Sequence, residues 1–220
     1  MARNLPLYAR PAAALILPLT LLAAPVAAQT SVKEDSVVLQ PDKVTDDAPE
    51  IETVAEANLP SWSVDNAKAL LAFIQSAGDE GLFPKDYNPD ALKAAIDGGN
   101  QITLDKVATD SFLLLATHMR DGRTPNAARK QWFMTDGDAQ TEPLIPLLGS
   151  ALTANDVAQA LVSLDPVHPD FAVLKAALKT AKTPADANAI RVNMERWRWM
   201  PRDLGEGYVV SNVPEYLTRV

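Results

Sequence analysis

Cysteine is absent from the 220 residues, and histidine occurs only twice. Without a thiol, the chain can form no disulfide, hold no metal through sulfur and use no cysteine nucleophile. His118 and His168 lie too far apart in the sequence to match a zinc-binding motif. We expect His118 to be a partly buried, hydrogen-bonded residue of an apolar helix and His168 to cap a helix. The sequence therefore predicts no metal site and no cofactor.

Basic residues are also few. Lys and Arg number 20 against 28 Asp and Glu, which gives a net charge of −8. Binding to nucleic acid rests largely on neutralising phosphates, so this balance predicts no nucleic-acid partner. The sequence has no Gly-x-Ser-x-Gly, Ser-x-x-Lys or Lys-Thr-Gly motif, and no Gly-rich phosphate loop. We predict no catalytic residue, and an enzyme of unrecognised mechanism is the alternative.

The first 28 residues have the composition of an export signal. Arg3 and Arg10 provide positive charge ahead of an uncharged apolar run from Ala12 to Ala24. Val26-Ala27-Ala28 then supplies the small residues that favour cleavage. The run is shorter than the about 20 apolar residues that a membrane span needs. We predict a cleaved signal peptide over residues 1–28 and no stable membrane span, with an uncleaved anchor as the alternative.

Residues 29–59 are strongly acidic. Two lysines stand against eight acids here, and no aromatic residue occurs. Self-repulsion and poor burial favour an extended, solvated segment. We predict an acidic disordered linker over residues 29–59. The alternative is a segment that attracts a basic partner.

Residues 60–203 show the spacing of apolar side chains that is typical of helices. Ala67, Leu70 and Ile74 follow Ser63, which can cap the first helix. Further helices are indicated at Asn88-Pro89, at Thr103, over residues 143–152, at Thr153 with Asp156, at His168-Pro169 and at Thr183-Pro184. We therefore predict a mainly α fold, with a helical domain over residues 60–203.

Residues 204–220 change to a strand pattern. Tyr208 to Val210 is aromatic and β-branched, and Tyr216 to Val220 alternates with a period of two. Two strands alone are marginally stable. We expect one or two strands that open a larger β domain, and we interpret the end at Val220 as a truncation of that domain.

The segment from Asn193 to Pro201 is unusual because two Trp residues fall within three positions. On a helix, Trp197 and Trp199 are about 200° apart. We predict that Trp197 extends a core line through Ile190 and Met194, whereas Trp199 packs elsewhere, against the Tyr208 strand. A stripe of Arg191, Glu195 and Arg198 predicts ion pairs. The residues to which we assign structural roles are Asn193, Glu195, Arg196, Trp197, Arg198 and Trp199.

The same segment resembles a known family. Asn193-x-Glu195-Arg196-Trp197-Arg198-Trp199-x-Pro201, followed by Asn212-Val213-Pro214-Glu215-Tyr216, is similar to the scaffold region that leads into the catalytic domain of large periplasmic L,D-transpeptidases. Shorter upstream phrases agree with this resemblance: Glu80-Gly81-Leu82-x-Pro84-x-x-Tyr87, Asp121-Gly122-Arg123, Trp132, and Leu164-x-Pro166-x-His168-Pro169-x-Phe171. The resemblance covers roughly residues 60–220.

The resemblance implies peptidoglycan chemistry in the periplasm. Such enzymes attack a tetrapeptide stem with a cysteine thiolate and pass the acyl group to a neighbouring stem amine. This chain has no cysteine. The resemblance therefore implies that residues 60–203 form a scaffold domain that is inactive alone, and that residues 204–220 form the opening strands of a truncated catalytic domain. Expected partners are the catalytic domain, cell-wall enzymes and peptidoglycan. The alternative is a stand-alone periplasmic adaptor that accepts a partner strand at its own strand edge.

Overall fold

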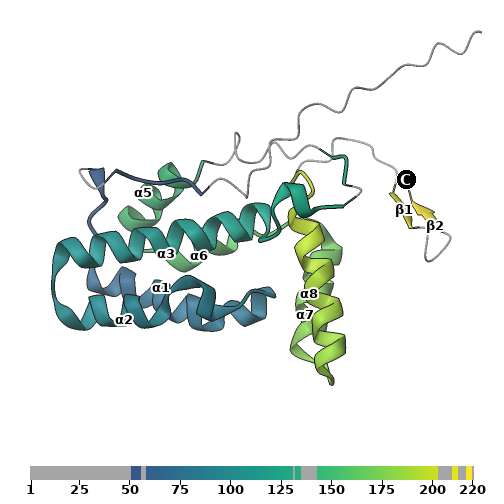
Figure 1. The fold of residues 1–220 in the computed structure, drawn as a ribbon, viewed down its shortest axis with the longest axis horizontal. Coiled ribbons are helices and arrows are strands. Elements are labelled where there is room, and N and C mark those ends of the chain that lie inside the picture. The colour runs from purple at the N-terminus through teal and green to yellow at the C-terminus, as the bar shows by residue number, and fades with distance from the viewer. Residues whose placement is uncertain are drawn as a thin grey trace, which may run out of the picture. The chain divides into compact units, whose positions relative to one another are not determined.

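The computed structural model describes residues 51–55, 58–130, 132–134, 143–202, 210–212 and 217–219. The predicted signal peptide, most of the predicted linker and the Tyr208 position lie outside the described residues. The described part is mainly helical, which confirms the predicted class (Figure 1). Its α-helices are α1 (Val64–Ser76), α2 (Pro89–Gly98), α3 (Gln101–Asp121), α5 (Leu144–Ala154), α6 (Val157–Val162), α7 (Pro169–Lys179) and α8 (Pro184–Arg198). Short 3-10 turns are η2 (Ala77–Glu80), η3 (Pro84–Tyr87) and η4 (Asn126–Ala128).

Side-chain caps fix the starts of several helices. Ser63 Oγ accepts a hydrogen bond from Asn66 N–H at 3.1 Å, as the sequence predicts. His168 and Thr183 also cap as predicted, for α7 and α8 respectively. Each cap supplies an acceptor for a backbone N–H that the first helical turn leaves without a partner.

Two predicted helix starts are wrong. Helix α3 begins at Gln101 rather than Thr103, because Asn100 Oδ1 accepts the N–H of Thr103 at 2.9 Å. Helix α6 is capped by Asp156 and not by Thr153, whose hydroxyl instead donates to the carbonyl of Gly149 in the preceding helix. Asn100 and Asp156 each stand directly before the first helical residue and supply an acceptor to the first turn.

The main core lies among α1, α2, α3, α5 and α6. Trp62 is its largest buried side chain; the indole N–H donates to Thr109 Oγ1 at 3.0 Å, and the ring meets Phe112 edge to face. A second, smaller cluster joins α7 to α8 through Phe171, Leu178 and Met194. Figure 1 shows this helix pair crossing near the C-terminal end of α3, where α3 and α8 are in contact.

After Arg202, the described residues form two short strands. Strand β1 (Val210–Asn212) pairs antiparallel with β2 (Leu217–Arg219), and Ser211 lies opposite Thr218. In the described residues, no helix is long and apolar enough to cross a membrane.

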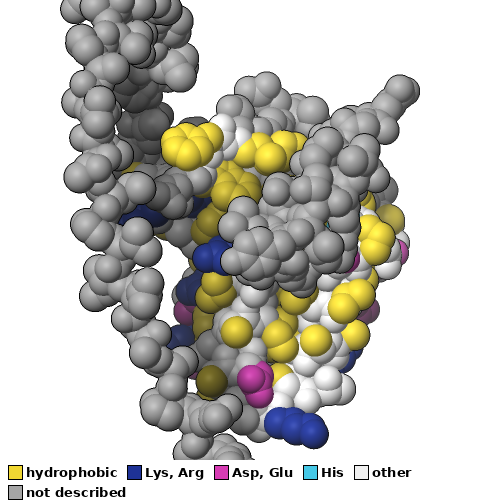
Figure 2. Space-filling view, turned by 90° about the vertical axis from the view of Figure 1, so that its right-hand side faces the viewer, with side chains coloured by type: hydrophobic (Ala, Val, Ile, Leu, Met, Phe, Trp, Pro, Cys, Tyr) yellow, Lys and Arg dark blue, Asp and Glu magenta, His cyan; other side chains and the backbone are white. Residues whose placement is uncertain are grey.

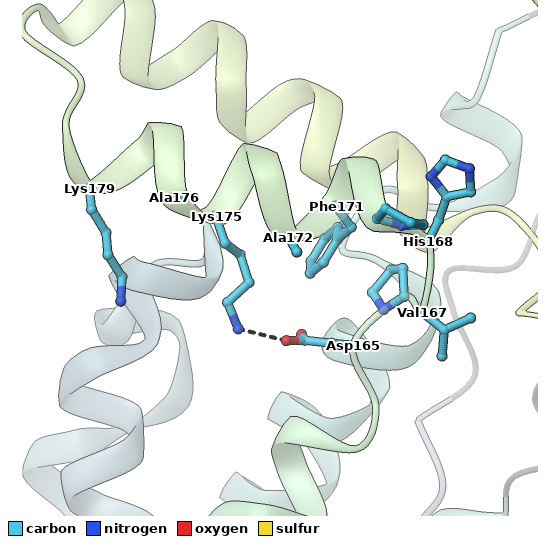
Figure 3. A pocket seen from close by; sticks show the side chains of 10 residues that line it. Asp165, Val167, His168, Phe171, Ala172, Lys175, Ala176 and Lys179 are labelled. Carbon is cyan, nitrogen blue, oxygen red and sulfur yellow. Dashed lines mark hydrogen bonds and ion pairs between the residues drawn. The ribbon is translucent and has the colours of Figure 1, made fainter.

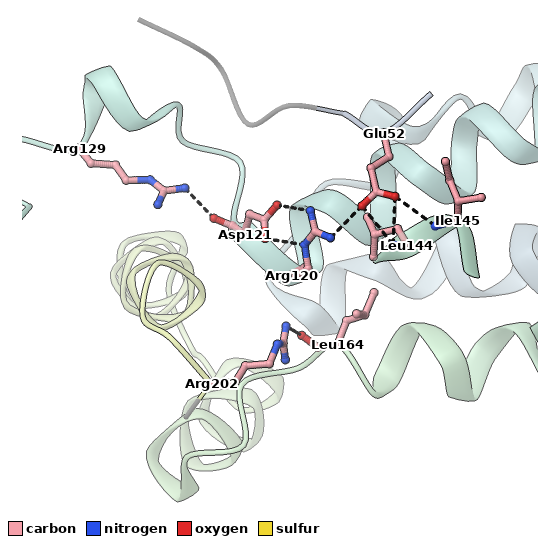
Figure 4. Close-up of polar contacts among 8 residues, drawn as sticks. All are labelled: Glu52, Arg120, Asp121, Arg129, Leu144, Ile145, Leu164 and Arg202. Atoms are coloured by element: carbon pink, nitrogen blue, oxygen red, sulfur yellow. Dashed lines mark hydrogen bonds and ion pairs between the residues drawn. The ribbon is translucent and has the colours of Figure 1, made fainter. Parts of the chain in front are cut away.

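The end of the predicted linker is attached to the helical domain. Glu52 accepts the N–H groups of Leu144 and Ile145 at 3.1 and 3.2 Å and pairs with the buried guanidinium of Arg120 at 3.0 Å (Figure 4). Helix α5 has no side-chain cap of its own, so this carboxylate occupies its N-terminus. The prediction of a solvated linker is therefore wrong for Glu52, because the helix start and Arg120 together hold its charge.

Candidate functional site

A groove of about 490 Å³ lies beside α8. Helix α8 supplies one continuous stripe to it, with residues at spacings of three and four, and the η2–η3 region and the loop after α3 supply the opposite wall. The lining residues are Gly81, Phe83, Arg123, Thr124, Asn188, Arg191, Val192, Glu195, Arg196 and Trp199. Figure 2 shows apolar side chains beside Lys and Arg side chains on the α7–α8 side of the molecule.

Arginines surround an exposed aromatic ring in this groove. The guanidinium carbons of Arg123 and Arg191 lie 4.8 and 5.6 Å from the centroid of the Phe83 ring, which is 38% exposed. Both distances are within the range of cation–π attraction. Arg123 also pairs with Asp86, whereas the side chain of Arg191 reaches only the neutral Asn188 amide oxygen at 3.5 Å. Arg191 therefore keeps its charge directed at the groove without a carboxylate partner among the described residues.

Glu195 joins α8 to the loop after α3. Its Oε1 accepts the N–H groups of Arg123 and Thr124 at 2.7 and 2.8 Å and the indole N–H of Trp199 at 3.1 Å. Gly122 makes this approach possible: its φ is +83°, and a Cβ there would come within 2.9 Å of Glu195 Oε1 and the Trp199 ring. The predicted ion pairs of Glu195 with Arg191 and Arg198 are wrong, because backbone donors take its carboxylate.

Trp199 packs against the loop that follows α3. Its ring meets Trp132 edge to face at 5.3 Å between centroids, and the Arg129 guanidinium carbon lies 5.1 Å from it. Arg129 is buried and donates to the carbonyls of Thr124 and Asp121, which fixes the loop (Figure 4). The prediction that Trp199 packs on a different side of the helix from Trp197 is confirmed. Its predicted contact with the Tyr208 strand involves residues outside the described part.

Arg198, rather than Trp197, is the large residue of α8 that is fully buried. Its guanidinium donates to the carbonyl of Glu80 at 2.7 Å and lies over the Phe171 ring at 5.2 Å. Met194 is buried as predicted. Trp197 is only half-buried and stacks on His168 with ring centroids 4.3 Å apart. The predicted line from Ile190 through Met194 to Trp197 is confirmed, because Met194 belongs to the buried cluster with Phe171 and Leu178, and Ile190 and Trp197 pack against that cluster.

The two remaining residues of the segment are exposed. Asn193 donates to the carbonyl of Ala189 on its own helix, and Arg196 lies at the edge of the groove. Beyond the segment, Arg202 donates to the carbonyls of Leu164 and Asp165 (Figure 4). The chain is therefore held on both sides of Trp199.

A second, smaller groove of about 420 Å³ runs along α7 (Figure 3). Lys175 points across it to Asp165 and also pairs with Glu80, each at 2.6 Å. Burial opposes the charge of Lys175, but these two carboxylates raise its pKa. Burial and the charge of Asp165 raise the pKa of Glu80. With Lys175 engaged by both carboxylates, this triad joins η2 to α7 and serves the fold.

Tyr87 of η3 and His118 of α3 form a polar pair. Tyr87 Oη lies 3.2 Å from His118 Nδ1, and burial raises the pKa of this phenol, so it stays protonated at neutral pH. Burial, and then the charge of Arg123, lower the pKa of His118, as expected for a partly buried histidine. No cluster of three His, Asp or Glu among the described residues could hold a metal ion. Three arginines and one glutamate line the groove, so its charge favours anions over cations.

Sequence reasoning missed the residues that α8 meets. Phe83, Arg123, Arg129 and Trp132 come from loops, where periodicity carries no signal. The phrase Asp121-Gly122-Arg123 and Trp132 entered only through the family resemblance. A glycine followed by arginine at the end of a helix was the available signal, since Gly122 ends α3.

The described residues form a helical domain with a groove beside α8. A family described as Scaffold domain matches residues 55–178, more than half of the chain, and the chain therefore belongs to that family. No curated protein and no solved structure matches the chain significantly.

Proposed function

We propose that this chain is the non-catalytic helical scaffold of an L,D-transpeptidase, with a role in peptidoglycan cross-linking and cell-wall remodelling. In this proposal the chain is exported to the periplasm by residues 1–28 and positions a catalytic domain that carries the cysteine. Membership of the Scaffold domain family supports the general role of a scaffold. The L,D-transpeptidase assignment rests on the resemblance of the Asn193–Pro201 segment.

The observation that carries the proposal is the anchoring of that segment. Glu195 and Trp199 bind the loop after α3, and Arg202 binds the carbonyls between α6 and α7. Residues after Arg202 thus continue from a fixed point on the helical domain. Such an anchor is what a scaffold needs in order to orient a domain that follows it.

The chemistry of the 220 residues agrees with a non-catalytic role. They contain no cysteine, so no thiolate can attack a stem peptide. We expect the purified chain to leave tetrapeptide muropeptides unchanged. A cross-linked product formed by the purified chain would contradict this role.

The cellular test is the muropeptide composition of the source organism. A strain whose native gene carries Trp199→Ala should contain fewer L,D-type cross-links, because the anchor loses its indole contacts with Glu195 and Trp132. Asn193→Ala, an exposed change on the same helix, is the matched control and should leave the composition unchanged. An unaltered share of these cross-links in a strain that lacks the gene would refute the proposal.

A further inference from the structure

The groove beside α8 has the chemistry of a site for an acidic peptide. Three of its lining residues are arginines, and one is a carboxylate, Glu195, whose Oε1 already accepts three N–H groups. Arg123 is paired with Asp86, which leaves Arg191 and Arg196 as the two charges that a ligand could neutralise. Arg191 hydrogen-bonds only to the neutral Asn188 amide oxygen and makes no ion pair with a carboxylate of the described residues. A guanidinium without a carboxylate partner can bind the carboxylate of a ligand.

The positions of these two arginines indicate the size of the ligand. They are five positions apart, so in an ideal helix they lie about 140° apart around the axis with Cα atoms about 9 Å apart. Val192, Glu195 and Trp199 lie between them around the helix axis, and Glu195 Oε1 is already bound by three N–H groups. Val192 is 50% exposed. The groove therefore presents two cations, with the apolar Val192 and Trp199 side chains and the hydrogen-bonded carboxylate of Glu195 between them.

We propose that this groove binds a short peptide carrying two carboxylates separated by an apolar side chain. Guanidinium groups bind carboxylates through paired, charge-assisted hydrogen bonds. The apolar side chain of the peptide would lie on Val192, Phe83 and Trp199. A single small anion would reach one cation and leave these apolar side chains uncovered. This inference does not rest on the proposed transpeptidase function.

The net charge of the whole chain makes the inference specific. At a net charge of −8, the protein as a whole does not attract acidic ligands. Any affinity for an acidic peptide must then come from a local site. Such affinity should fall as ionic strength rises, since added salt screens exposed charges.

The test uses the full chain and isothermal titration calorimetry. The probe is a blocked tripeptide of sequence Glu-Leu-Glu, compared with blocked Gln-Leu-Gln and with inorganic phosphate. We expect the acidic peptide to bind and its uncharged counterpart to bind at least about tenfold more weakly. This comparison uses only the wild-type chain, so it does not depend on the folding of a variant.

Substitutions then locate the site. Arg191→Gln and Arg196→Gln should each weaken binding of the acidic peptide about tenfold, because each loses one charged hydrogen-bond donor group. Lys68→Gln, which removes the same charge from an exposed position on α1, should leave binding unchanged. Equal binding of the two peptides, unchanged binding by both arginine variants, or phosphate binding as tight as that of the acidic peptide would each overturn the assignment.

Discussion

Replacement of Glu195 by Ala is expected to be the most damaging change to the surface that joins α8 to the loop after α3. One oxygen of Glu195 accepts three N–H groups, from Arg123, Thr124 and Trp199. A buried donor that loses its acceptor costs about 1–3 kcal/mol. These donors are only partly buried, so water can replace some of the loss. We expect Glu195→Ala to lower the free energy of unfolding by about 2–4 kcal/mol in total.

The conservative variant separates geometry from charge. Glu195→Gln keeps an amide oxygen that can accept the same N–H groups and removes only the negative charge. We expect it to cost about 1 kcal/mol, since hydrogen bonds to a charged acceptor are roughly twice as strong as neutral ones. The exposed Asn193→Ala change on the same helix should stay within about 0.5 kcal/mol of wild type.

The assay is urea unfolding followed by far-UV circular dichroism. Tryptophan fluorescence is less suitable as the main signal, because Glu195 contacts the Trp199 indole directly. It reports the local change instead, as a shift in the native emission spectrum. If Glu195→Ala were no more destabilising than Asn193→Ala, the reasoning about this junction would be refuted.

Three further predictions follow from buried contacts. Gly122→Ala should lower the free energy of unfolding by about 1–3 kcal/mol in urea denaturation, because an L residue at its positive φ is strained and its Cβ would press on Glu195 and Trp199. A variant as stable as wild type would contradict this prediction. In thermal unfolding, Arg198→Ala should lower the free energy of unfolding by about 3 kcal/mol. Arg198→Met should lower it clearly less, because Met refills the space against Phe171. Equal losses of stability in the two variants would contradict this prediction. Partial burial alone would raise the pKa of Glu52, but hydrogen bonds from Leu144 and Arg120 outweigh it and lower the pKa. The stability contribution of the Glu52 carboxylate should therefore be complete above the unfolded pKa of about 4.3 and be lost as the pH falls through the lower folded pKa. The free energies of unfolding of wild type and Glu52→Gln should thus converge on acidification, and a constant difference between them would refute the prediction.

The helices were predictable because their signals are local. Ser63, His168 and Thr183 cap as the sequence indicates, and the apolar residues that follow them repeat with the helical period. Where two candidate acceptors compete, as with Thr153 and Asp156, a sequence gives no distance by which to choose between them. The error at the start of α6 has this origin.

The site was less predictable because it depends on contacts between distant segments. Glu195 meets N–H groups more than 70 positions earlier in the chain. A helical stripe of Arg191, Glu195 and Arg198 indicates ion pairs when the helix is considered alone. In the folded chain, the carbonyl of Glu80 and the N–H groups after Gly122 are the stronger competitors for these side chains.

The same competition explains Glu52. Its sequence surroundings are acidic and poor in apolar residues, which favours a solvated segment. A helix start without a cap and a buried guanidinium nevertheless provide three N–H donors for one carboxylate. No feature within residues 29–59 could reveal a partner that lies about 70 to 90 positions later.

The most direct test of the scaffold proposal is to recover the native protein from the cell envelope of its source. An antibody against residues 60–200 would isolate it without denaturation, and mass spectrometry would identify every polypeptide in the sample. The proposal predicts peptides of a cysteine-containing L,D-transpeptidase domain, either on the same polypeptide or bound to it. Recovery of this chain with no such domain, fused or bound, would contradict the proposal.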